Sequence, residues 1–230
     1  MTNMKYNSVQ QKGFFINYKP APEGTQVENK FCGSHDIEGA TCPNCKKPLL
    51  RFLTVNSDDK HIDIGKYQYK KIHFMYCWTC NISQREFFYQ IIDDNKVSII
   101  QYSKGGVQKD FPYPNYPENF PLGKIDFIEI SEEDQRIISK VNSEEIDEFD
   151  LPDKDSHLSI PKHQFGGEPC LVQMEFDKIN CPKCKSEMQF IVSIADDCID
   201  DRGFVENEYV QVLYYYCKDC CMIGAIQHSD

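Results

Sequence analysis

The chain has 230 residues, of which 40% are apolar, so it is long enough for one large domain or two small ones. Its formal net charge of −11 opposes nucleic-acid binding, because such binding depends on neutralising phosphates. The sequence shows no secretory signal and no run of about 18–20 apolar residues, so we expect a cytoplasmic protein without a membrane partner.

Eight of the twelve cysteines form four C-x-x-C pairs. The first two pairs flank a segment of 31 residues, and the last two flank a segment of 32 residues. In a reducing compartment such pairs are more often metal ligands than disulfides. Two intervening residues let a tight turn direct both sulfurs at one ion, and two turns complete a closed tetrahedron that leaves no position for substrate. The spacing predicts two structural zinc ions, which iron can replace in an expression host, with these ligands: Cys42, Cys45, Cys77, Cys80, Cys181, Cys184, Cys217 and Cys220.

Residues 1–30 are predicted to form an N-terminal arm on the surface. The segment is polar and has few periodic apolar positions. One short strand is expected at residues 14–16, and a Pro/Gly-rich turn follows it.

Residues 31–102 are predicted to form a first zinc-ribbon-like half. Apolar and β-branched residues after Cys45, interrupted only by Arg51, indicate a mostly buried strand. The dense aromatic run that leads into Cys77 indicates the returning strand. Two further strand-like runs meet at residues 93–95, which predicts a hairpin turn.

Residues 103–158 are predicted to be a Pro/aromatic linker followed by an acidic helical segment. The alternation of prolines and aromatics indicates an extended stretch that either binds a partner or covers the protein's own core. Ser131, followed by three acidic residues, predicts a capped helix start, and a second short helical turn is expected from Ser143. Residues 126–155 hold twelve acidic and three basic side chains, which fits a solvated linker helix or a patch that mimics nucleic acid or masks a basic protein.

Residues 159–230 are predicted to form the second zinc-ribbon-like half. Met188, Phe190 and Val192 are expected to share one face of the strand after its first cysteine pair. A run of bulky residues then returns to the second pair, and a short last strand follows.

The two halves match beyond their cysteines. Leu49 and Met188 stand four places after the inner cysteine of their first pair, and Phe52 and Ile191 stand seven places after it. We interpret this match as an internal duplication. The predicted fold is therefore mainly β with one or two short helices, built from duplicated, pseudo-symmetric zinc-ribbon-like β-hairpin halves.

Four cysteines have no partner at ligand spacing: Cys32, Cys170, Cys198 and Cys221. Cys32 and Cys170 are expected to be small buried hydrophobic residues, and Cys221 is an alternative to Cys220 as a ligand. Thiol catalysis would need a histidine base, and the candidate nearest to Cys170 in the sequence is His163. The sequence contains no phosphate loop and no dinucleotide fingerprint.

The second half carries a distinctive order of motifs: Phe165-Gly166-Gly167-Glu168-Pro169, Gln173, Cys181-Pro182-Lys183-Cys184, Met188 and Phe190. This order resembles the YwqG-like bacterial family of unknown function, and it is similar to the eukaryotic programmed cell death protein 2 family. The first half fits weakly, because no Gly-Gly-x-Pro turn precedes Cys32. The resemblance implies a pseudo-symmetric β-rich fold with duplicated halves. The eukaryotic relatives escort a ribosomal protein, and a client of that kind would suit an acidic surface.

The favoured hypothesis is a non-enzymatic zinc protein that serves as a protein–protein interaction or client-shielding module, with a basic protein as its partner. An enzyme of unspecified reaction is the first alternative, with a site between the halves around Gly166, Gly167, Gln173 and Asp200. A zinc-ribbon nucleic-acid binder is the second, and the negative charge opposes it. No catalytic or cofactor-binding residue is predicted.

Overall fold

The fold is described from a computed structural model, which covers residues 7–10, 12–65, 67–77, 86–104, 119–172, 178–195 and 210–229. The strands in this part of the chain are β1 (Phe14–Pro20), β2 (Lys30–Phe31), β3 (Leu50–Asn56), β4 (Lys71–Tyr76), β5 (Phe87–Asp93), β6 (Lys96–Gln101), β7 (Gly123–Glu129), β8 (Gln164–Phe165), β9 (Gln189–Ala195), β10 (Val210–Cys217) and β11 (Met222–Ser229). Its helical elements are α1 (Glu132–Asn142) and two short 3-10 turns, η1 (Glu148–Asp150) and η2 (Ser156–Leu158).

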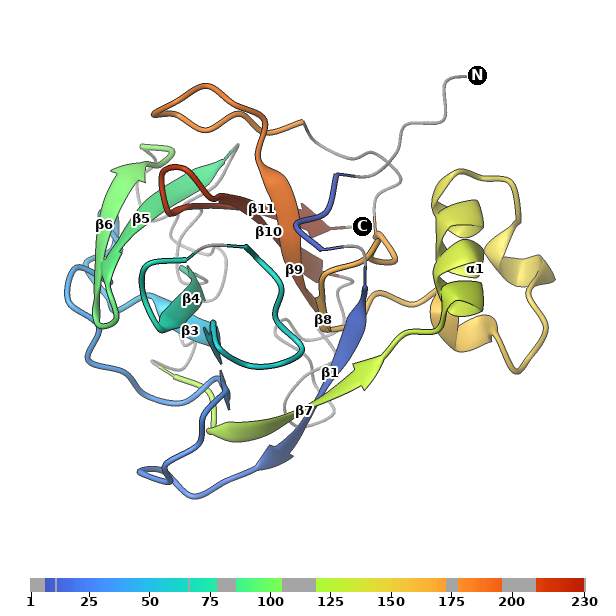
Figure 1. The fold of residues 1–230 in the computed structure, drawn as a ribbon, viewed down its shortest axis with the longest axis horizontal. Coiled ribbons are helices and arrows are strands. Elements are labelled where there is room, and N and C mark those ends of the chain that lie inside the picture. Colours follow the sequence, from blue (N-terminus) through green and yellow to red (C-terminus); the bar gives the residue numbers. More distant parts are fainter. Residues whose placement is uncertain are drawn as a thin grey trace.

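Within the described residues, the eleven strands form one curled antiparallel sheet in the order β4-β3-β2-β7-β1-β8-β9-β10-β11-β5-β6 (Figure 1). The predicted mainly-β class is confirmed. The hairpin predicted at residues 93–95 is confirmed as the turn between β5 and β6.

The β3–β4 and β9–β10 hairpins have the same pairing pattern. Each contains one β-bulge in its first strand, at Phe52 in β3 and at Ile191 in β9. From the bulge to the far end of each hairpin, the residue pairs follow the same register. Phe52 and Ile191, which stand at the same distance from their cysteine pairs in the sequence, are therefore the two bulge residues.

The bulge corrects one prediction about the second half. Met188 and Phe190 lie in the apolar cluster around the second group of cysteines, but Val192 lies in the main core on the other face. An extra residue in one strand reverses the alternation of side chains beyond it. The prediction that all three side chains share a face was therefore wrong for Val192.

Strands β1 and β7 form the centre of the sheet and join its two sides. They pair along their whole length, with Asn17 facing Asp126 at the midpoint, and each also pairs with a two-residue strand, β8 or β2. The expected surface arm therefore contributes a central strand, and the expected linker contributes that strand's partner. The last residues of both strands are exposed, and only the first few positions of each strand are buried in alternation. The apolar pattern is therefore short, which weakens the signal for a full-length strand.

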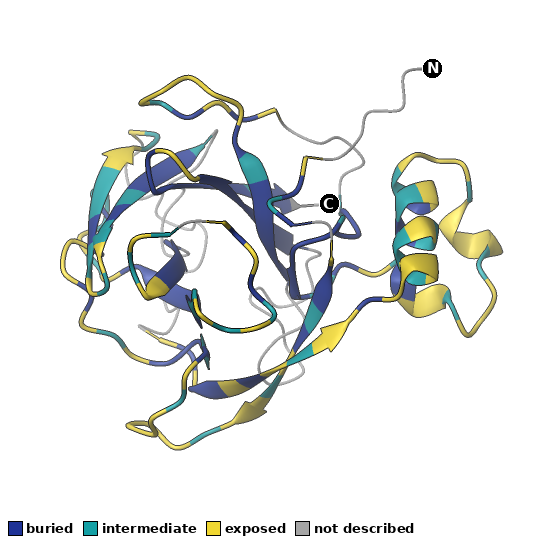
Figure 2. Ribbon diagram, viewed as in Figure 1, coloured by how far each residue is buried: buried dark blue, intermediate teal, exposed yellow. Residues whose placement is uncertain are grey.

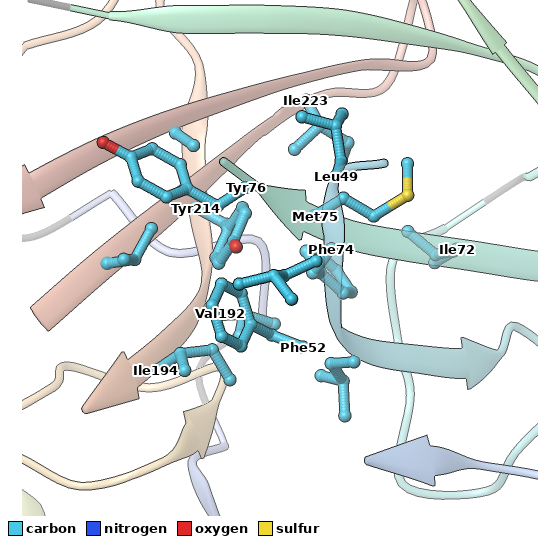
Figure 3. Packing of buried hydrophobic residues seen from close by; sticks show 14 of the residues in the cluster. Leu49, Phe52, Ile72, Phe74, Met75, Tyr76, Val192, Ile194, Tyr214 and Ile223 are labelled. Atoms are coloured by element: carbon cyan, nitrogen blue, oxygen red, sulfur yellow. The ribbon is translucent and has the colours of Figure 1, made fainter. Parts of the chain in front are cut away.

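The main core lies inside the curl of the sheet, where side chains from both hairpins meet (Figure 3). Phe74 of β4 contacts Tyr214 of β10 edge to face, with ring centroids 5.3 Å apart. Phe52 and Val192 pack in the same cluster. Both hairpins therefore bury their inner faces in one shared core, which couples the stability of the two halves.

Tyr89 holds the two ends of the curled sheet together. Its hydroxyl donates to the carbonyl of His73 at 2.7 Å and accepts from the backbone N–H of Met75 at 3.0 Å. Tyr89 lies on β5, whereas both of its partners lie on β4. One buried side chain thus satisfies backbone groups at the free edge of β4, an edge that would otherwise need another strand.

Residues 131–158, here called the acidic lobe, lie outside the curled sheet (Figure 1). The predicted cap is confirmed, since the Ser131 side chain accepts a hydrogen bond from the backbone of Asp134. Ile138 and Val141 are buried on the narrow apolar face of α1. The second helical turn begins at Glu148 rather than at Ser143, because Ser143 is the C-cap of α1. In the described part of the chain, no helix is long and apolar enough to cross a membrane.

Candidate metal centres

The first cysteine turn is built by backbone hydrogen bonds around Cys42. Its N–H donates to the carbonyl of Lys47 at 2.8 Å, and its carbonyl accepts from the N–H of Lys46 at 3.0 Å. Lys46 directly follows Cys45 and has a positive φ of 63°. This left-handed residue reverses the chain tightly, so that the turn leads directly into β3.

The second cysteine turn has the same bonds. The N–H of Cys181 donates to the carbonyl of Ser186 at 2.9 Å, and its carbonyl accepts from the N–H of Lys185, also at 2.9 Å. Lys185 follows Cys184 and has a φ of 65°. The two turns therefore present their cysteine pairs in the same way.

The sulfurs of Cys181, Cys184, Cys217 and Cys220 lie within 4.8 Å of one another. The Sγ atoms of Cys184 and Cys217 are 3.5 Å apart. Sulfurs that bind one tetrahedral zinc at about 2.3 Å are separated by about 3.8 Å, whereas a disulfide brings them to about 2.05 Å. The spacing fits four ligands around one ion and does not fit a disulfide, so this group could hold a metal ion.

A corresponding group lies beside the first hairpin. The sulfurs of Cys42, Cys45 and Cys77 lie within 4.8 Å of one another, and those of Cys45 and Cys77 are 3.6 Å apart. The predicted fourth ligand, Cys80, lies outside the described residues. Three of the four predicted ligands are therefore gathered at a spacing that could hold a second metal ion.

The thiols of the second group differ in their acidity. Hydrogen bonds from the backbone and side chain of Ser186 lower the pKa of Cys184 to about 6. Burial raises the pKa of Cys220 to about 11, and it raises the pKa of Cys217 further. Four thiolates so close together repel one another, and a divalent cation offsets that repulsion and favours the ionised form that binds metal.

Cys221 occupies a turn position rather than a ligand position. It follows Cys220 as Lys46 and Lys185 follow their cysteine pairs, and like them it has a positive φ, here 48°. Its carbonyl accepts a hydrogen bond from the N–H of Ile91. Its sulfur lies outside the group of four in which the Cys220 sulfur belongs, which favours Cys220 as the ligand.

Two of the unassigned cysteines are buried in apolar clusters, as expected. Cys32 lies in the main core, and burial raises the pKa of its thiol well above the ordinary value. Cys170 lies in a cluster under α1, and burial raises the pKa of its thiol to about 12. The candidate base His163 accepts a hydrogen bond at Nδ1 from the backbone of Ala195 instead. Cys198 lies outside the described residues.

The Gly166-Gly167 turn is a point of close packing. Both residues have positive φ, and a Cβ added to Gly166 would lie 2.4 Å from Cγ of Gln10. A Cβ added to Gly167 would lie 2.5 Å from Oε1 of Gln135. Only glycine fits both the conformation and the space.

The first half has a turn of the same kind that sequence reasoning missed. Cys32 and Gly33 have φ values of 54° and 83°, and the N–H of Cys32 donates to the carbonyl of the bulge residue Phe52. The N–H of Gly166 donates in the same way to the bulge residue Ile191. A single glycine after a cysteine gives too weak a signal to identify this turn from the sequence.

Side chains of α1 form hydrogen bonds with the polar groups that follow the Gly166-Gly167 turn. Gln135 accepts from the N–H of Glu168 at 2.9 Å. Asn142 donates to the Glu168 carboxylate at 3.0 Å and to the carbonyl of Pro169 at 2.9 Å. These bonds tie the acidic lobe to the sheet and give the turn a structural role. The remaining residues of the suggested enzyme site, Gln173 and Asp200, lie outside the described residues.

A carboxylate–imidazole pair occurs in the loop between β3 and β4. Nδ1 of His61 lies 2.7 Å from a carboxylate oxygen of Asp59, whose other oxygen accepts from Asn29. The imidazole packs against Phe14 and Phe127. The carboxylate of Asp59 also accepts from the backbone N–H of His61 at 2.9 Å, so the pair helps to order the loop.

Comparison with known proteins finds no matching family model, and it finds no match among curated proteins. The similarity to the YwqG-like and programmed cell death protein 2 families therefore stays a prediction.

Proposed function

We propose that the protein is a zinc-stabilised protein-interaction module without enzymatic activity. Two structural zinc ions would hold the hairpins, one bound by Cys42, Cys45, Cys77 and Cys80 and the other by Cys181, Cys184, Cys217 and Cys220. The observation that carries the proposal is the convergence of four sulfurs at one point beside the second hairpin. A site with four cysteine ligands has no free coordination position, so its metal supports the fold rather than a reaction.

We further propose that the two hairpins are zinc ribbons that arose by duplication. The shared register, the bulge at corresponding positions and the two turns with equal hydrogen bonds support this origin. The positive-φ turns beside Phe52 and Ile191 add a fourth correspondence. This arrangement is also what membership of the YwqG-like family would imply.

The acidic lobe is the surface that we propose binds the partner. It carries ten acidic and three basic side chains. Arg136 forms an ion pair with Glu133 at 3.0 Å inside the lobe, so one of the three basic side chains is already paired. Each zinc site with four thiolates would add a formal charge of −2. A basic protein is the partner that such a field attracts most strongly.

A reducing cytoplasm is the compartment that suits this proposal. All ten cysteines in the described residues are free of disulfides. Free thiols persist where the glutathione and thioredoxin systems keep them reduced.

Affinity capture at low salt tests the proposed function. The tagged protein should retain the same basic protein from its own cells in repeated experiments, and the double variant Glu145→Lys/Asp153→Lys should lose it, because both exposed positions lie on the lobe. The double variant Asp36→Lys/Asp58→Lys makes the same charge change at exposed positions elsewhere and should retain the partner. Failure to capture a reproducible partner, or equal loss in both variants, would contradict the proposal.

A further inference from the structure

Phe149 is the most exposed large hydrophobic side chain in the part of the chain that the structure describes. It is 88% exposed, whereas Ile100, Ile128 and Ile160 are 44–47% exposed. The lobe around it presents a mostly exposed surface (Figure 2). Burial of an aromatic ring contributes a large favourable free energy, which an exposed ring does not provide. The Phe149 side chain therefore contributes little to the stability of the isolated fold.

Hydrogen bonds hold the backbone at Phe149 in the 3-10 turn η1. The Asp147 carboxylate accepts from the N–H of Phe149 at 3.0 Å, and the Asp147 carbonyl accepts from the N–H of Asp150, also at 3.0 Å. The N–H of Leu151 donates to the carbonyl of Glu148. The side chains of Ile146 and Leu151 on either side are partly buried. Binding through Phe149 would therefore order little additional backbone, which lowers the entropic cost of association.

The charge around Phe149 determines the kind of partner. Residues 143–155 contain seven acidic side chains and one lysine. Asp147, Glu148 and Asp150 have no ion-pair partner among the described residues. Such a segment repels phosphates of nucleic acid, anionic membranes and a second copy of a chain with a charge of −11. A basic protein surface with an apolar groove is the partner that complements both the ring and its surroundings.

We propose that the acidic lobe docks on a basic protein by inserting Phe149 into an apolar groove of that partner. This inference rests on the proposed interaction function and names the anchor of its interface. Aromatic anchors surrounded by a polar rim carry much of the binding energy in protein interfaces. The acidic side chains around Phe149 would form that rim, where they orient the partner and speed its approach.

Two labelled synthetic peptides of equal net charge test the inference by fluorescence anisotropy. One has lysine and leucine at helical spacing and therefore offers an apolar stripe between basic flanks, and the other is poly-lysine. The protein should bind the lysine–leucine peptide more tightly, and Phe149→Ala should weaken that binding about tenfold. Poly-lysine binding should not change. Phe149→Leu should retain most of the affinity, and Ile160→Ala, which truncates another exposed apolar side chain, should retain all of it.

The zinc content and circular dichroism of the Phe149→Ala variant should equal those of the wild type, since the ring makes few contacts with the fold. Wild-type affinity of Phe149→Ala for the lysine–leucine peptide would overturn the inference. Failure of the wild type to prefer that peptide would overturn it as well. If affinity capture still returns a partner that depends on the lobe, only the Phe149 anchor is wrong; if capture fails too, the proposed function falls with it.

Discussion

Lys185 adopts a backbone conformation that favours glycine. Its φ of 65° lies in the left-handed region, which costs a residue with a Cβ about 1–2 kcal/mol. We therefore expect Lys185→Gly to leave the free energy of unfolding unchanged or to raise it by up to about 1 kcal/mol, since the greater freedom of glycine in the unfolded chain offsets part of the gain. Urea unfolding at a fixed zinc concentration measures the change.

Lys183 provides the matched control, because it is an exposed lysine of the same turn without a positive φ. Lys183→Gly should lower the free energy of unfolding through backbone entropy alone. Equal losses in Lys183→Gly and Lys185→Gly would contradict this account of the turn.

His73 should make the fold sensitive to mild acid. Its Nε2 donates to the carbonyl of Asp94 and its Nδ1 accepts from the hydroxyl of Thr54, so the buried ring is neutral, and burial lowers its pKa to about 4. The unfolded chain, with a histidine pKa near 6.5, takes up the proton first. Stability is therefore lost as the pH falls from about 6.5 towards 4, by about 3 kcal/mol in total.

Comparison with His73→Gln at each pH isolates this contribution, because the thiol groups titrate alike in both proteins. Denaturant unfolding should show a wild-type stability that falls more steeply on acidification than that of the variant. Parallel pH profiles would show that His73 is not the source.

At the scale of single residues, the sequence predicts what depends on spacing and misses what depends on tertiary contact. The paired cysteines are recognisable because two intervening residues are enough to build the turn. Arg51 could only be read as an interruption of a strand. In the structure its guanidinium donates two hydrogen bonds, of 2.9 and 2.7 Å, to the carbonyl of Cys32. That partner is distant in the sequence, and no local pattern identifies it.

Among the elements, the glycine turn should be the least tolerant of substitution. We expect Gly166→Ala to lower the free energy of unfolding by about 2–4 kcal/mol, because the methyl group would meet both Gln10 and the carbonyl of Lys12. Gly24→Ala is the control, since Gly24 also has a positive φ but nothing lies within 4 Å of its added Cβ. It should cost about 1 kcal/mol.

Chemical denaturation of the three proteins measures both losses. Similar losses for Gly166→Ala and Gly24→Ala would show that the backbone conformation alone determines the loss of stability. The close contacts of Gly166 with Gln10 and Lys12 would then contribute nothing to the difference in stability.

The two bulges and the central pairing of β1 with β7 could not be predicted from the sequence. A bulge depends on how two strands pair, so an alternating pattern read from Met188 onward places Val192 on the wrong face. Strands β1 and β7 have exposed C-terminal ends, and their central place in the sheet depends on pairing with each other and with β8 and β2. The capped helix, by contrast, follows from a local signal at Ser131 and was predictable.

For the whole molecule, metal binding and packing should act together. Zinc binding contributes on the order of 10–16 kcal/mol in small zinc domains, which matches or exceeds the roughly 5–15 kcal/mol that stabilises a typical domain. The hairpins share one core, where Phe74 meets Tyr214. We therefore expect loss of either ion to weaken both halves of the sheet.

The number of zinc ions released by the denatured protein tests the central claim most directly. Elemental analysis and a chromogenic zinc indicator should both find two zinc equivalents for each wild-type chain. Cys181→Ser or Cys80→Ser should each lower the content towards one, since each variant removes one of four ligands from one site. Fewer than two equivalents from the wild type, or full zinc content in both variants, would contradict the account.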